Sequence, residues 1–174
     1  MPAVKRIMLN MDLPRVNERN LHVLRASLVS GTIASLASTA ALVLLAKAQK
    51  KSALQPLNAT SHWLHGAKAA ERDTADVAHT AVGYATHHAS AIFWALPFQA
   101  WLALRPNRAS SALLRDAAVM SAIAAAVDYG VVPKRLTPGW ELVLSKTSLI
   151  ATYGALALGL FAGARLVERF LARR

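Results

Sequence analysis

Four long apolar stretches constrain this chain more than any other feature of its sequence. They cover about residues 26–46, 79–104, 112–132 and 142–164, and the first stretch contains no charged residue. An α-helix needs about 20 apolar residues to cross a hydrocarbon core of about 30 Å. Inside a bilayer every backbone polar group must find a partner, and a helix provides one within the segment. The sequence therefore predicts an all-α integral membrane protein built as a four-helix bundle.

Composition and charge agree with this class and exclude others. Hydrophobic residues make up 55% of the 174 residues, and the net charge is +11. The basic residues lie in caps and loops beside the apolar stretches, where anionic lipid headgroups attract them. Nucleic-acid binders carry such residues on a separate basic face, so we expect the lipid bilayer and no nucleic acid as partner. The absence of Cys excludes disulfides, thiolate zinc sites and Cys-ligated iron–sulfur clusters.

The remaining segments complete a single transmembrane domain over residues 1–174. Residues 1–25 resemble an interfacial lead-in helix, because leucines recur there at helical spacing. Residues 47–78 form the longest linker, in which we expect a short helix outside the membrane. Residues 165–174 form a basic tail.

The distribution of Lys and Arg predicts the orientation of the spans. Four spans place both termini and the 105–111 loop on one side, with twelve basic residues: Lys5, Arg6, Arg15, Arg19, Arg25, Arg105, Arg108, Arg115, Arg165, Arg169, Arg173 and Arg174. The other side has eight: Lys47, Lys50, Lys51, Lys68, Arg72, Lys134, Arg135 and Lys146. The positive-inside rule then places both termini in the cytoplasm.

Small residues at four-residue spacing occur in every apolar stretch. They are Ser27, Gly31, Ser35 and Thr39; Ala81, Ala85 and Ala89; Ala118, Ala122, Ala126 and Gly130; and Ala155, Gly159 and Gly163. Membrane helices associate through such faces, because small side chains let two backbones approach closely. The GxxxG pair Gly159 and Gly163 fits packing within one bundle or a homodimer.

A group of polar residues is expected near the outer side of the membrane. It consists of His62 and His65 in the linker, His79, His87 and His88 in the second stretch, and Asp128 in the third. Imidazole ligates zinc, iron and copper, and a carboxylate orients such a ligand, so these six residues are candidates for a metal or haem b site. Interhelical hydrogen bonding and proton or ion passage through Asp128 are the alternatives. For the Asp128 carboxylate we expect a partner among the histidines of the second stretch, Lys134 or Arg135.

No sequence signature identifies an enzyme. The P-loop, GxSxG, HExxH and GxGxxG patterns are absent, and no catalytic residue is assigned. His62-x-x-His65 and His87-His88 resemble the histidine boxes of membrane di-iron enzymes, but the chain has too few histidines to complete such a set. Asn58-Ala59-Thr60 matches a glycosylation acceptor, a short pattern that commonly arises by chance.

Three segments of the sequence, Leu57–Gly66, Gly83–Trp94 and Asp128–Glu141, carry a likeness that covers about residues 26–165. Together they resemble a family of uncharacterised, small, four-helix inner-membrane proteins of proteobacteria, for which no activity is defined. The positions that carry it are His62, Trp63, His87, His88, Trp94, Asp128, Pro133 and Pro138. The resemblance implies a multi-pass protein of the bacterial inner membrane, and it implies no chemistry.

These observations favour a membrane protein with a structural or accessory role, as a homodimer or as a small subunit of a larger membrane complex. A metal- or haem-binding protein is the first alternative, and a protein for proton or ion passage is the second. If the chain has a site, we expect it between the second and third stretches, where His87 and Asp128 lie towards the outer face.

Overall fold

The computed structural model describes residues 17–105 and 108–170. Most of the predicted lead-in helix and the last residues of the basic tail therefore lie outside the described residues. Every regular element in the described ranges is helical. In chain order they are α2 (Glu18–Ala48), α3 (Gln55–Ala59), α4 (His62–His65), η1 (Ala67–Glu71), η2 (Val77–Ala81), α5 (Val82–Ala103), α6 (Ser110–Gly130), η3 (Lys134–Leu136), η4 (Trp140–Leu142) and α7 (Lys146–Phe170).

Within the described residues, three of the four long helices, α2, α6 and α7, are long and apolar enough to cross a membrane. This confirms the all-helical class and three of the four predicted stretches as helices of that kind. The fourth long helix, α5, has 22 residues and contains no Asp, Glu, Lys or Arg. It is not among these three helices, and His87, His88, Pro97 and Gln99 lie within it.

Some boundaries differ from those expected, for local reasons. The described part of the lead-in is the first turns of α2, which begins after Asn17, whose side chain accepts a hydrogen bond from the Arg19 backbone N–H at 3.0 Å. The expected start of the last helix at residue 142 is wrong, because Trp140–Leu142 form the separate turn η4 before α7 begins at Lys146. The 47–78 linker contains α3, α4 and η1 where one short helix was expected.

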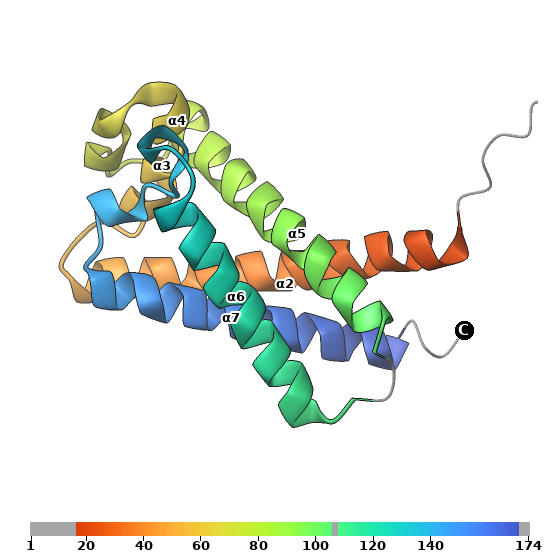
Figure 1. Cartoon of the computed structure of the whole chain (residues 1–174). Helices are drawn as coiled ribbons and strands as arrows, with labels where there is room; N and C mark the ends of the chain where they lie inside the picture. Colours follow the sequence, from red (N-terminus) through yellow and green to blue (C-terminus); the bar gives the residue numbers. More distant parts are fainter. Residues whose placement is uncertain (1–16, 106–107, 171–174) are drawn as a thin grey trace, which may run out of the picture.

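The four long helices are arranged around α2, as Figure 1 shows. α2 lies between α7 and α5, and α6 packs mainly on α7 with a smaller contact to α5. α2 begins and α7 ends at the same end of the molecule, on the right of the figure. The short elements α3, α4 and η1 to η4 gather at the opposite end, which we call the capped end.

The closest approach between two long helices is that of α7 to α2. A Cβ atom added to Gly159 would lie 2.4 Å from the Cα of Ala34, and one added to Gly163 would lie 2.4 Å from the Cα of Ser30. No other residue fits at these positions without separating the backbones. The GxxxG pair therefore packs against α2 of the same chain, which is one of the two arrangements that the sequence left open.

On its other side, α2 packs on α5 through a further glycine and several polar side chains. A Cβ atom on Gly31 would lie 2.6 Å from the Cα of Ile92. Close to it, the Gln99 side-chain amide donates to Ser30 Oγ at 3.0 Å. Gly31 and Ser27 of the small face predicted from the sequence thus contact α5, whereas α7 packs on the neighbouring row with Ser30 and Ala34.

We predict that Gly159→Ala destabilises the protein although alanine is the better helix former. The added methyl group forces α7 away from α2, which in packed cores costs about 1–3 kcal/mol. Gly154→Ala is the matched control, because a Cβ on Gly154 meets no atom within 4 Å. Thermal unfolding of both variants in detergent, followed by circular dichroism, should give a lower midpoint for Gly159→Ala alone. Equal midpoints for the two variants would contradict the close packing.

Candidate functional site

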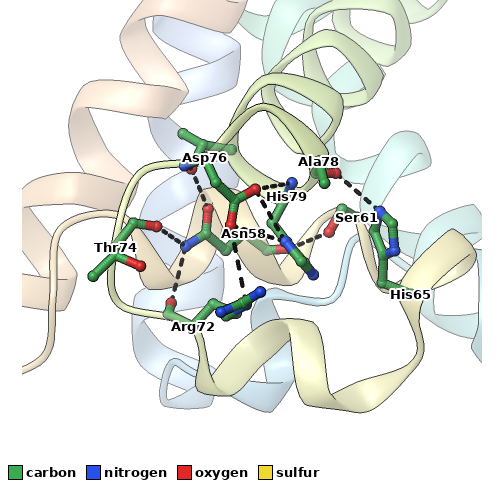
Figure 2. Close-up of polar contacts among 9 residues, drawn as sticks. Asn58, Ser61, His65, Arg72, Thr74, Asp76, Ala78 and His79 are labelled. Atoms are coloured by element: carbon green, nitrogen blue, oxygen red, sulfur yellow. Dashed lines mark hydrogen bonds and ion pairs between the residues drawn. The ribbon is translucent and has the colours of Figure 1, made fainter.

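The capped end is held together by Asn58, a buried side chain in α3. Its amide donates to the backbone oxygens of Arg72 at 2.9 Å and Thr74 at 3.1 Å. Its oxygen accepts a hydrogen bond from Thr80 Oγ1 at 2.6 Å. Because this one side chain bonds both the 72–74 segment and η2, it fixes the path of the chain into α5 (Figure 2). The Asn58-Ala59-Thr60 pattern is therefore part of the folded cap, and its amide is engaged inside the protein.

Asp76 begins η2 and orders two of the predicted site histidines. Its Oδ1 accepts from the His79 backbone N–H at 2.6 Å, and both its oxygens lie 3.0 Å from His79 Nδ1. The His65 ring lies against that of His79, tilted by 39° with centroids 4.4 Å apart. Its Nε2 lies 2.9 Å from the Ala78 oxygen, as Figure 2 shows. The hydrogen bond from the His79 backbone N–H, with smaller contributions from the His79 ring and Arg72, lowers the pKa of the Asp76 carboxyl.

His62 links the two loops of the capped end, which are the linker between α2 and α5 and the segment between α6 and α7. Its Nδ1 lies 3.1 Å from the Ala59 oxygen and its Nε2 lies 3.1 Å from the Lys134 oxygen. Gly139 lies against it in a left-handed conformation, with φ +81°, and a Cβ there would be 2.7 Å from His62 Nδ1. The loop after α6 can therefore approach α3 this closely only because position 139 is glycine.

A cavity of about 180 Å³ lies beneath these loops, at the capped ends of α5 and α6. We call it the cap cavity. It is lined by Thr60, Trp63, Thr86, His87, Ser90, Asp128, Leu136, Thr137, Pro138 and Trp140. These residues come from both loops and from both helices, so the cavity exists only when the cap is folded onto the bundle. Two of its lining residues, His87 and Asp128, belong to the group that the sequence analysis placed between the second and third stretches.

The two titratable residues of the cap cavity are each held by another helix. His87 Nε2 lies 3.0 Å from Ser38 Oγ, and that hydroxyl donates its proton to the Ala34 oxygen at 2.7 Å. Asp128 Oδ2 accepts a hydrogen bond from the Tyr153 hydroxyl at 2.6 Å. α5 is thus joined to α2, and α6 to α7, next to the same cavity.

The six predicted ligands occupy several separate places. His65 in the linker lies against His79 of η2, and His62 bridges the two loops. His87 and Asp128 share the cap cavity, whereas His88 stacks on Tyr84 with ring centroids 5.8 Å apart. No group of three or more His, Asp or Glu side chains within residues 17–105 and 108–170 is placed to hold a metal ion. The structure therefore brings together His87 with Asp128 and His65 with His79, and does not join all six.

The expected partner of Asp128 is wrong, since its carboxylate accepts from Tyr153 of α7. The sequence interpretation paired the second and third stretches, whereas α6 packs mainly on α7. It also missed the hydroxyl and indole residues of the cavity, namely Thr60, Thr86, Ser90, Thr137 and Trp140. Thr60 and Trp140 lie within segments that were already singled out, and Thr86 lies one residue before His87. Ser90 and Thr137 also lie within singled-out segments, but neither residue was itself marked as part of a site.

Comparisons with known proteins leave the site to be argued from its geometry. No protein-family model matches the chain, and searches of curated proteins and of solved structures give no match either.

We predict that Asp76→Ala destabilises the cap in a pH-dependent way. A carboxyl group whose pKa is lowered by folding stabilises the protein above its unfolded pKa, near 3.8, and this contribution disappears as the pH falls through the lower folded value. The thermal midpoint of Asp76→Ala should therefore be below that of the parent protein at pH 7. The two midpoints should converge below pH 3.8.

Asp73→Ala is the control for this experiment. Asp73 is exposed, and among the described residues its carboxylate makes no hydrogen bond or ion pair. Its substitution should leave the midpoint unchanged at both pH values. A constant difference between Asp76→Ala and the parent protein across the titration would contradict the role assigned to the Asp76 carboxylate.

Proposed function

We propose that the chain is a four-span protein of the bacterial inner membrane with a structural or accessory role, and that both its termini lie in the cytoplasm. In this proposal α2, α5, α6 and α7 are the spans of one four-helix bundle. The capped end, with α3, α4 and η1 to η4, then lies at the outer surface. The lipid bilayer is the partner that the apolar helices require.

The register between α2 and α5 carries the proposal. Three contacts at successive depths pair Ser38 with His87, Gly31 with Ile92, and Ser27 with Ala95. The α2 residues in these pairs cover about 16 Å of helix at 1.5 Å per residue. α2 is long and apolar enough to cross a membrane. A helix that runs beside it through that depth, with no Asp, Glu, Lys or Arg of its own, crosses the same layer.

The use of the polar side chains supports a structural role. Gln99 bonds Ser30, His87 bonds Ser38, and Tyr153 bonds Asp128, so each of these contacts joins two long helices. Hydrogen bonds of this kind contribute about 0.6 kcal/mol each in membrane proteins. Together with the glycine contacts they position the helices, and they leave fewer polar groups for chemistry.

Two alternatives have less support. A metal or haem b site would need more ligands at one point than the His87 and Asp128 pair in the cap cavity supplies. Proton or ion passage through Asp128 is favoured by its position between the cavity and Tyr153.

Assembly as a homodimer is compatible with α6, where the small residues Ala118, Ala122, Ala126 and Gly130 are exposed. The same face would serve a subunit of a larger membrane complex.

Labelling of single cysteines tests the four-span topology. The chain has no Cys, so Ala75→Cys, Ser110→Cys and Lys134→Cys each introduce one thiol at an exposed position. A membrane-impermeant maleimide added to intact spheroplasts should label positions 75 and 134. It should label position 110 only after the membrane is disrupted.

Two other labelling patterns would contradict the proposal. If α5 does not cross the membrane, positions 75 and 110 lie on the same side and react alike. Labelling of position 110 in intact spheroplasts, with positions 75 and 134 labelled only after disruption, would show the opposite orientation.

A further inference from the structure

The cap cavity has one acidic residue, Asp128, and one imidazole, His87, and its other side chains are indoles, hydroxyl-bearing residues and the apolar Leu136 and Pro138. Among its ten lining residues only Asp128 bears a carboxylate. One of its oxygens accepts from Tyr153, which leaves the other lone pairs of the carboxylate for a further partner. A carboxylate within an apolar helix requires compensation, because leaving water costs about 2.5–3.5 kcal/mol on insertion scales. A positively charged group in the cavity would provide it.

The hydrogen-bond donors of the lining are largely used within the protein. Trp63 Nε1 donates to Thr86 Oγ1 at 3.2 Å, and Trp140 Nε1 donates to Thr60 Oγ1 at 3.0 Å. The Thr86 and Thr60 hydroxyls donate in turn to backbone oxygens of their own helical turns, at 2.9 and 3.0 Å. An anion would therefore find few free donors in this cavity, whereas a cation would find acceptors and two indole rings.

The charged groups outside the lining do not change the preference of the cavity for a cation over an anion. The Glu141 carboxylate accepts from Thr137, one of the lining residues, and so adds a second negative charge close to the cavity. Arg135 is exposed at the rim, where its Nε donates to the Trp63 oxygen at 2.9 Å. Lys134, the other basic residue of this loop, is also exposed. Water screens these two cations better than the interior screens Asp128.

The size of the cavity limits the ligand. A cavity of about 150 Å³ accommodates benzene, which has six heavy atoms. The cap cavity measures about 180 Å³ and suits an ion of similar size. A bare metal ion would leave most of this space empty and would meet few ligands.

We propose that the cap cavity binds a small organic ammonium ion, with its nitrogen beside Asp128 and its alkyl groups against Trp63 and Trp140. Indole is the strongest of the natural side chains in attracting a cation to its face, with about 2 kcal/mol where the site is desolvated. The carboxylate supplies the opposite charge. The same chemistry fits a free alkylammonium solute and the ethanolammonium headgroup of a lipid, since the cavity lies at one end of the bundle.

Calorimetric titration of the whole protein in detergent with tetramethylammonium chloride tests the proposal. We expect saturable binding of this ion, and none of sodium chloride or of tert-butanol, which has the same heavy-atom count without the charge. Asp128→Asn should abolish the binding. Asp116→Asn is the matched control, because it removes a carboxylate of the same helix near the opposite end and should leave the affinity unchanged. Trp63→Leu should weaken binding about tenfold.

Three results would overturn the proposal: no saturable heat with tetramethylammonium, equal binding of tert-butanol, or full binding by folded Asp128→Asn. If Asp128→Asn does not fold, Ser90→Phe provides the test, because it fills the cavity from α5 and keeps every charge. Retained binding in that variant would place the ion elsewhere and refute the site.

Titration in nanodiscs separates the two sources of the ligand. With phosphatidylethanolamine as the lipid, a headgroup occupant would compete, and tetramethylammonium would bind more weakly than in phosphatidylglycerol nanodiscs. Equal affinity in the two lipids assigns the site to a free solute. Both results support an ammonium site, whereas absence of binding in phosphatidylglycerol nanodiscs as well as in detergent refutes it.

Discussion

The contact of α2 with its two neighbours through glycine is the constraint on which the rest of the structure depends. Lipid tails are as apolar as leucine, so burial of apolar surface does little to hold membrane helices together. Gly159 and Gly163 bring α7 onto α2, and Gly31 brings α5 onto the opposite side. With these three helices fixed, α6 packs on α7 and the loops close over one end. The cap cavity follows from this arrangement, because its walls come from α5, α6 and the loops.

Polar side chains add hydrogen bonds between the helices to the close packing at the glycines. Gln99 with Ser30 and His87 with Ser38 fix the register of α5 on α2, and Asp128 with Tyr153 fixes α6 on α7. In the cap, Asn58 and Asp76 order the linker that leads into α5. The same residues thus stabilise the bundle and shape the cavity, so a structural role and a binding site are compatible in one protein.

The sequence predicted where the helices lie along the chain better than it predicted which helices pack together. Long apolar stretches and small-residue spacing revealed four helices and the packing face with Gly159, because both patterns are local. The partner of Asp128 could not be predicted, since it depends on α6 lying on α7, a contact between helices that no local pattern records. The same holds for the cavity, whose threonines and tryptophans are ordinary in sequence and become neighbours only when both loops fold over the helices. The start of α7 was misplaced because the apolar run continues through the turn at Trp140.

The depth of α5 in the membrane tests this account most directly. Phe93 is exposed on α5 next to Ile92, which packs on Gly31, and exposed Leu28 and Leu36 flank that depth on α2. Spin labels at these three positions in reconstituted bilayers report immersion through their relative accessibility to oxygen and to a water-soluble nickel complex. If α5 spans the membrane beside α2, the label at Phe93 is as accessible to oxygen as the two α2 labels and is protected from the nickel complex. A Phe93 label as accessible to nickel as one at Ala75 would contradict the account.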